Sequence, residues 1–125
     1  MEPQIFVIDD EDSVRNSLDA LLNAVGYETQ SFATAADFLK ALGGTDPQRP
    51  RCLLLDLQLP DMNGLDLLNE LISRDESMPT IVMTGHGDDE FESTATQRNA
   101  VAYFQKPFDA SHLLDVLSGV LAQAT

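Results

Sequence analysis

Three short apolar segments of the sequence end in acidic or hydroxyl side chains. Residues 5–8 run into Asp9 and Asp10, residues 53–55 run into Asp56, and residues 81–83 run into Thr84. A continuous apolar run of this length is typical of a strand that is buried on both faces. If these strands are parallel neighbours, their carboxyl ends meet at the edge where open α/β sheets bind ligands. The three aspartates would then share one site.

Clustered carboxylates predict a bound cation. At a separation of ~4 Å and an effective dielectric constant of ~20, each like-charge pair costs on the order of 4 kcal/mol. Three acids in one small site therefore require a counter-charge, and oxygen ligands favour a hard divalent ion such as Mg²⁺. These residue types predict metal-assisted phosphate chemistry.

The segments between the apolar runs have helical periodicity. Apolar residues spaced three or four apart predict helices over residues 14–25, 35–42, 65–72, 88–98 and 113–121, of which the fourth has few apolar positions. Two more strands are expected, a polar edge strand at residues 27–32 and a short strand at residues 101–104. Five strands alternating with five helices predict a doubly wound α/β domain with a parallel sheet and helices on both faces.

Composition limits the function of the chain. Its 125 residues suit one domain, and 21 acidic against 7 basic residues give a formal charge of −14, which opposes direct binding to nucleic acid or to an anionic membrane. No apolar run approaches the ~18 residues of a membrane span and the sequence shows no leader peptide, so we expect a cytoplasmic protein. Cys52 has no partner cysteine for a disulfide and is expected to be a buried strand residue.

Several polar residues near these motifs have ordinary structural explanations. Thr34 is expected to cap the second helix, with Asp37 placed for the reciprocal bond of a capping box. Asp61 and Asn63, which precede Gly64, are expected to form a turn and not to bind metal. His86 and His112 are expected to be solvent-facing.

Four motifs together resemble the receiver domain of bacterial two-component response regulators. They are VIDDE at residues 7–11, LDLQLPDMNG at 55–64, MTGHGD at 83–88 and KPF at 106–108. They stand in the order and spacing of the family, so the resemblance covers essentially the whole chain, residues 1–125. The third motif is most similar to receivers of LuxR-type, FixJ-like transcriptional regulators. The resemblance implies a flavodoxin-like receiver fold with strand order 2-1-3-4-5.

The resemblance also implies a site for phosphoryl transfer. It assigns Asp56 as the residue phosphorylated by a sensor histidine kinase, and a carboxylate is chemically able to act as that nucleophile. Lys106 would pair with a phosphoryl oxygen, and Thr84 would donate its hydroxyl to another.

The metal ligands follow from the same resemblance. Asp10, Asp56 and the backbone carbonyl of Gln58 would coordinate Mg²⁺, with Asp9 assisting through water. A set of oxygen ligands that retains water is what Mg²⁺ prefers.

Switching and output are implied in the same way. Thr84 and Tyr103 would move together on phosphorylation, and a cis bond before Pro107 would aim Lys106 into the site. The expected output is transcription through a DNA-binding domain attached after residue 125, because the receiver itself would not touch nucleic acid. A homodimer formed on phosphorylation is compatible with the resemblance, but the polar helix at residues 88–98 and Ala102 do not favour the usual dimer face.

Three other functions fit the sequence less well. A pseudo-receiver, which would bind partners without accepting phosphate, is the main alternative, although the site positions are filled by the usual residue types. A flavin-binding module is disfavoured because acids at residues 9–12 would repel a phosphate. An aspartate-based phosphatase would need a second acid at the position of Gln58 and a cap domain.

Overall fold

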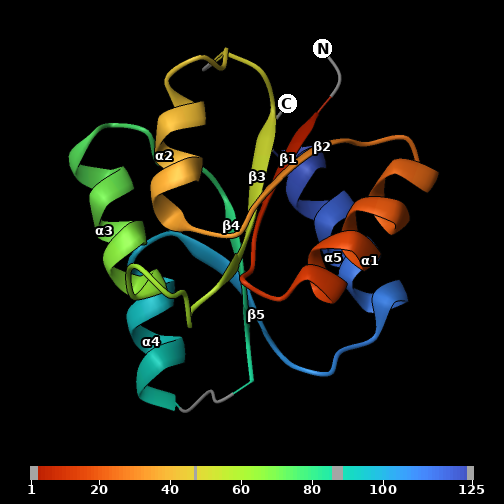
Figure 1. Cartoon of the computed structure of the whole chain (residues 1–125). Helices are drawn as coiled ribbons and strands as arrows, with labels where there is room; N and C mark the ends of the chain where they lie inside the picture. Colours follow the sequence, from red (N-terminus) through yellow and green to blue (C-terminus); the bar gives the residue numbers. More distant parts are fainter. Residues whose placement is uncertain (1–2, 47, 86–88, 124–125) are drawn as a thin grey trace.

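Strands and helices alternate along the chain in this computed structural model, which describes residues 3–46, 48–85 and 89–123 (Figure 1). The strands are β1 (Gln4–Ile8), β2 (Glu28–Phe32), β3 (Arg51–Asp56), β4 (Thr80–Thr84) and β5 (Ala100–Gln105). The helices are α1 (Asp12–Ala24), α2 (Ala35–Leu42), α3 (Gly64–Ser73), α4 (Asp89–Gln97) and α5 (Ala110–Gln123). Within the described ranges no helix has the length and apolar character needed to cross a membrane.

All neighbouring strands are parallel, and the sheet has the order β2-β1-β3-β4-β5. This confirms the predicted doubly wound α/β domain and the strand order 2-1-3-4-5. The polar strand β2 lies at one edge, as expected, and β5 lies at the other. Because β2 and β3 lie on opposite sides of β1, the carboxyl ends of β1 and β3 are where an open α/β sheet is expected to bind a ligand.

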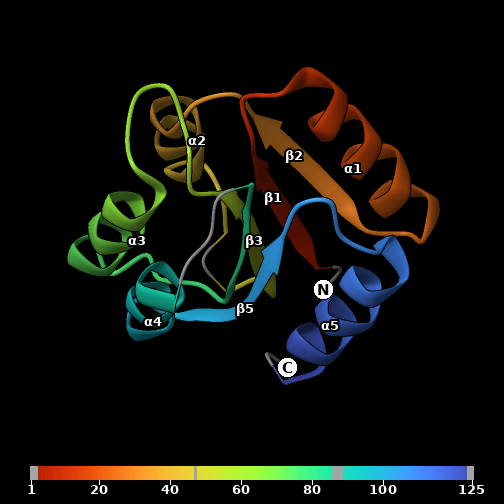
Figure 2. The same ribbon diagram turned by 90° about the horizontal axis from the view of Figure 1, so that it is seen from below.

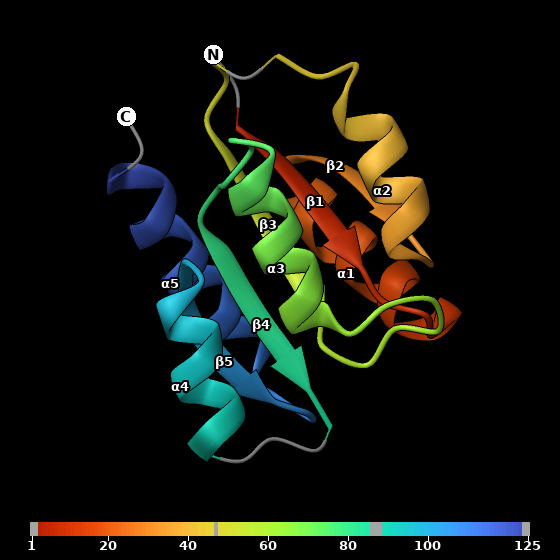
Figure 3. The ribbon, with the colours of Figure 1, turned by 90° about the vertical axis from the view of Figure 1, so that its left-hand side faces the viewer.

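Helices cover both faces of the sheet, which explains the continuous apolar runs. Figures 1 and 3 show α2, α3 and α4 on one face, while Figure 1 shows α1 and α5 on the other. Along β1, Phe6 and Ile8 point into the core under α2 and α3, whereas Ile5 and Val7 point into the core under α1 and α5. A strand between two cores needs apolar side chains at every position.

The predicted helices differ from the observed ones mainly at their ends. Val25 and Ile72 were expected on buried helix faces, but they are 52% and 43% exposed. The prediction for Val25 is wrong because α1 ends at Ala24. Val25 is the C-cap residue, so its side chain no longer lies on the buried face of the helix. Gly26 follows with a positive φ of 96°, the left-handed stop expected of glycine.

Helix α4 is packed as weakly as its sequence predicts. Among residues 90–97 only Ala95 is buried, and Phe91 is 38% exposed. The turn after the helix uses Asn99 with a φ of 78°, a left-handed conformation that asparagine adopts more readily than most residues. Arg98 donates to the carbonyl oxygen of Leu65 over 2.8 Å and so ties the end of α4 to the first turn of α3.

Candidate functional site

The register between β1 and β3 brings two of the predicted acids together. Ile8 pairs with Leu55, so Asp9 and Asp56 each lie at or directly beyond the carboxyl end of neighbouring strands. Both residues are buried, with 0% and 4% of their surface exposed. Figure 2 views the molecule from this edge of the sheet, where the loops after β1, β3 and β5 converge.

The same register continues across β4 and β5. Asp56 pairs with Met83, the residue before Thr84, and Thr84 pairs with Gln105, the residue before Lys106. The amide of Lys106 also donates to the carbonyl oxygen of Thr84 over 2.7 Å. Asp9 and Lys106, which are 97 positions apart in the chain, therefore meet because the paired strands all end at the same edge of the sheet.

Three carboxylates form the centre of the site. Asp9, Asp10 and Asp56 each offer one oxygen, and these oxygens all lie within 4.8 Å of one another. Asp10 is exposed, so the cluster opens to solvent on one side. The amide of Gln58 donates to Oδ1 of Asp56 over 3.0 Å, which places the Gln58 backbone beside the cluster. Carboxylate oxygens with an adjacent peptide and access to water fit the ligands that Mg²⁺ takes.

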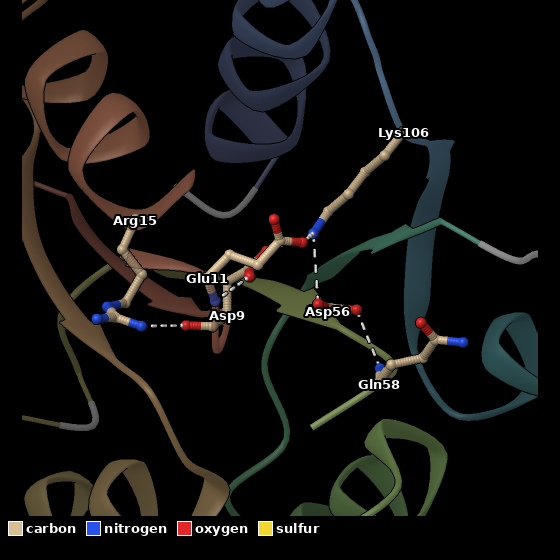
Figure 4. A network of polar contacts seen from close by, with 6 residues as sticks. All are labelled: Asp9, Glu11, Arg15, Asp56, Gln58 and Lys106. Atoms are coloured by element: carbon tan, nitrogen blue, oxygen red, sulfur yellow. Dashed lines mark hydrogen bonds and ion pairs between the residues drawn. The ribbon is translucent and has the colours of Figure 1, made fainter. Parts of the chain in front are cut away.

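Lys106 supplies a positive charge to the acids (Figure 4). Its Nζ lies 2.6 Å from Oδ2 of Asp9 and 3.3 Å from Oδ2 of Asp56. Glu11 is a third, weaker partner, because its carboxylate is 3.7 Å away and 60% exposed. The lysine side chain itself is only 16% exposed. A buried pair with good hydrogen-bond geometry fixes the lysine over the acids.

The ion pairs and burial shift two pKa values. Burial raises the pKa of the Asp56 carboxyl above its ordinary value, although the amide of Gln58 and the charge of Lys106 act in the opposite direction. Burial alone would lower the pKa of the Lys106 ammonium, but its hydrogen bond to Asp9 and the charge of Asp56 outweigh burial and raise it. Lys106 is therefore a permanent cation in this site at neutral pH.

Thr84 and Tyr103 lie on adjacent strands near the acids. Thr84 is buried, with 1% of its surface exposed, and lines a small cavity of about 140 Å³ together with Leu57, Gln58, Asn63 and Phe91. Tyr103 is half-buried and packs against the core on the α2–α4 side of the sheet. The two residues predicted to act as a switch are thus both on the side of the sheet that faces α4.

Other predicted residues fall around this centre. The peptide bond between Lys106 and Pro107 is cis, as the resemblance implied. Pro107 lines a wider groove of about 730 Å³ between α1 and the loop before α5. His112 is exposed and its ring stacks on Phe104 with centroids 5.0 Å apart. His86 lies outside the described residues.

The loop between β3 and α3 holds Gln58 in place through local contacts. Asn63 was expected only to form a turn, but its side chain accepts from the amide of Leu65 over 2.8 Å and so caps α3. Gly64 is required because a Cβ there would lie 2.7 Å from the Cα of Leu57. The amide of Gly64 donates to the carbonyl oxygen of Leu57 over 2.8 Å, and this closes the loop at its base.

Two residues have roles that sequence reasoning missed. Asp61 was expected only to form a turn, but its carboxylate accepts from the amides of Ala35 and Ala36 at the start of α2. Arg15 donates to the carbonyl oxygen of Asp9 over 2.6 Å (Figure 4). It also forms an ion pair with Asp12. The contacts of Arg15 could have been predicted, because an arginine one turn into a helix that follows an acidic segment is a usable signal. No local sequence pattern predicts the contact of Asp61 with α2.

Comparison with known proteins identifies relatives over nearly the whole chain. Residues 5–118 match the response regulator receiver domain family. Nodulation protein W of Bradyrhizobium diazoefficiens is 38% identical over 113 residues, which cover 90% of this chain and 48% of that protein. Transcriptional regulatory protein FixJ of Azorhizobium caulinodans is 38% identical over 120 residues, which cover 96% and 56%. This chain spans about half the length of these relatives.

Solved structures agree with the sequence relatives. A CheY-like response regulator receiver domain protein of Methanospirillum hungatei JF-1 has a TM-score of 0.90 at 27% identity, covering 99% of this chain and 97% of that one. The FixJ-N crystal structure has a TM-score of 0.85 at 30% identity, covering 98% and 95%. With the sheet order, the acidic edge and the sequence match all in agreement, this chain belongs to the response regulator receiver domain family.

Proposed function

We propose that this chain is a signalling switch in which Asp56 accepts a phosphoryl group from a sensor histidine kinase. Family membership supports the general role of phosphoacceptor, and the position of Asp56 supports the choice of residue. Its carboxylate ends a buried strand, 3.3 Å from Nζ of Lys106 and in the centre of the acidic cluster. A carboxylate oxygen would form the new bond to phosphorus while the phosphorus–nitrogen bond to the kinase histidine breaks, and the imidazole would leave with the electron pair.

Mg²⁺ is the proposed cofactor. Asp10, Asp56 and the carbonyl oxygen of Gln58 would hold the ion, and Asp9 would assist through water. The clustering of three carboxylate oxygens within 4.8 Å supports this assignment. When bound, Mg²⁺ would neutralise the acids and stabilise the charge that develops on the phosphoryl oxygens.

Lys106 and Thr84 are proposed to stabilise the phosphoryl group on Asp56. Because Nζ of Lys106 already lies within 3.3 Å of the Asp56 carboxylate, the ammonium can pair with a phosphoryl oxygen after a small movement. The Thr84 hydroxyl would donate to a second oxygen from the neighbouring strand end. Donors aimed at developing charge lower the barrier because they need no reorganisation during the reaction.

The proposed response to phosphorylation involves Thr84, Tyr103 and α4. Movement of the Thr84 hydroxyl toward the phosphoryl group would let the half-buried ring of Tyr103 change its packing. Loose packing of α4, in which Ala95 alone is buried among residues 90–97, supports a second arrangement of similar free energy. The phosphoryl group would then shift the population between two packings that already exist.

Transcriptional control is the proposed output. The relatives are about twice as long as this chain, and one of those described above is named a transcriptional regulatory protein. Residues 1–125 would therefore be the N-terminal receiver domain of a longer cytoplasmic regulator whose attached domain binds DNA. The formal charge of −14 opposes DNA binding by the receiver itself. Homodimer formation on phosphorylation is part of the same proposal.

The proposal is tested by incubating the protein with acetyl phosphate and Mg²⁺ and measuring intact mass. We expect one phosphate adduct on the wild type, no adduct without Mg²⁺ and none on Asp56→Ala. Lys106→Ala is expected to slow adduct formation by about 10²-fold or more, the usual cost of removing a donor that stabilises transition-state charge.

Asp115→Asn is the matched control, since it removes one negative charge from the exposed middle of α5. It should be phosphorylated like the wild type. A wild type that gains no adduct, or an Asp56→Ala variant that gains as much as the wild type, would favour the pseudo-receiver over a phosphoacceptor.

A further inference from the structure

Asp61 makes a contact between the loop after β3 and a helix that lies well before it in the chain. Its Oδ1 accepts from the amide of Ala35 over 3.1 Å, and its Oδ2 accepts from the amide of Ala36 over 3.0 Å. Both oxygens are used, so the carboxylate is held in one orientation at the first turn of α2. Figure 3 shows the loop leaving the end of β3 and passing close to the start of α2.

Helix α2 has a cap of its own, so Asp61 is an additional connection. Thr34 is the N-cap residue, and its hydroxyl accepts from the amide of Asp37 over 3.1 Å. The amides of Ala35 and Ala36 are different donors that the helix leaves without an intrahelical partner. A carboxylate from a distant loop therefore completes the helix start and at the same time fixes the loop to it.

The other end of this loop lies in the acidic site. Gln58 bonds to Oδ1 of Asp56 through its amide and forms a bridge with Asn63 across the loop. Only Leu59 and Pro60 separate Gln58 from Asp61. Leu59 packs against the core, and the ring of Pro60 restricts its own backbone. With so short and constrained a connection, the position of Asp61 sets the position of the Gln58 peptide.

We propose that Asp61 is a positioning residue for Mg²⁺ binding, which acts by tethering the β3–α3 loop to α2 so that the Gln58 carbonyl stays in place beside Asp10 and Asp56. This inference rests on the proposed function, because Gln58 is a ligand only under that proposal. Asp61 touches neither the ion nor the phosphoryl group. Its loss leaves every ligand in the chain but releases the peptide that carries one of them.

The test is a titration of the whole chain with Mg²⁺, followed through the backbone amide NMR signals of residues 56–58. We expect Asp61→Ala to raise the Mg²⁺ dissociation constant about tenfold, the lower end of what residues outside the ligand set contribute. Asp61→Asn should have a smaller effect, because its single side-chain oxygen can keep one of the two amide partners. The amide signals of α5 report whether each variant is folded.

Thr34→Ala is the matched control, because it weakens the start of the same helix without releasing the loop. Its dissociation constant should stay within about twofold of the wild type, below the effect expected for a tether outside the ligand set. Equal weakening by Thr34→Ala and Asp61→Ala would overturn the inference, since α2 stability and not the tether would then be responsible. Unchanged affinity in Asp61→Ala would also overturn it while leaving the proposed function intact, whereas a wild type without Mg²⁺-dependent shifts would overturn both.

Discussion

Replacing Asp56 with asparagine should stabilise the protein in the absence of Mg²⁺ and remove the stabilisation that Mg²⁺ provides. The carboxylate oxygens of Asp9, Asp10 and Asp56 lie within 4.8 Å of one another, so loss of one charge relieves two repulsive pairs. Burial also raises the pKa of Asp56, which means that the folded state disfavours its charged form. Asparagine has nearly the same shape and carries no charge.

The magnitude follows from the distances. At an effective dielectric constant of ~20, each repulsive pair costs about 3.5 kcal/mol if its oxygens are as far apart as the 4.8 Å limit. The attraction between Asp56 and Lys106 at 3.3 Å, about 5 kcal/mol on the same scale, is lost as well. A net gain of about 2 kcal/mol remains, and screening at the exposed Asp10 reduces it to about 1 kcal/mol. For a domain of this size, 1 to 2 kcal/mol raises the Tm by about 4 to 8 °C.

Thermal unfolding by circular dichroism in EDTA and in Mg²⁺ checks both parts of this prediction. If the wild type binds Mg²⁺ with a Kd of about 1 mM, then about 10 mM Mg²⁺ stabilises it by about 1.4 kcal/mol, because the ion binds only the folded state. The Asp56→Asn variant should show a higher Tm in EDTA and almost no response to Mg²⁺. Asp115→Asn should behave like the wild type in both buffers. An Asp56→Asn variant that melts at or below the wild-type temperature in EDTA would show that repulsion does not dominate the site.

Three further predictions concern other parts of the molecule. Gly64→Ala should lower the free energy of unfolding in urea by about 1–3 kcal/mol, since its Cβ would lie 2.7 Å from the Cα of Leu57. Gly119→Ala, at an exposed position of α5 with open space around it, should raise that free energy by about 0.5–1 kcal/mol. Equal effects of the two changes would contradict the close contact at Gly64. Cys52 is fully buried and its pKa is raised to about 12, so a thiol reagent should modify it only when urea unfolds the protein, and rapid labelling of the native state would argue against its burial. Desolvation acts to raise the pKa of Asp61, but the amides of Ala36 and Ala35 outweigh it and lower the pKa, so its stabilising effect is present at neutral pH and is lost as the pH falls. The Tm difference between the wild type and Asp61→Asn should therefore shrink as the pH falls below about 5, and a difference that is constant down to acidic pH would contradict the lowered pKa.

Much of the fold was predictable from local sequence patterns. Continuous apolar runs predicted the buried strands β1, β3 and β4, because a strand between two helical layers has no solvent face. The polar segment at residues 27–32 correctly predicted an edge strand, and the poor apolar pattern at residues 88–98 predicted the loosely packed α4. The error at Val25 arose because periodicity does not report the residue at which a helix stops, whereas Ile72 lies within α3 but on a partly exposed side of it.

The acidic cluster was also predictable, for a reason that lies in sheet geometry. Asp9 and Asp56 each lie at a strand end, and parallel strands in register bring such residues to one edge whatever the loops do. Lys106 was expected beside them from its KPF motif. Its ion pair with both Asp9 and Asp56 depended on the path of the chain after β5.

The sequence by itself determined the alternation of elements, the buried strands and the edge at which the acids meet, because each of these follows from residue type and short-range spacing. Only the tertiary structure decided that Asp61 bonds to the start of α2 and that Gly64 lies against Leu57. These contacts join surfaces whose separation depends on how loops and helices pack. The spacing of apolar residues in the sequence does not predict the distance between two such surfaces, because that distance depends on the packing of every element between them.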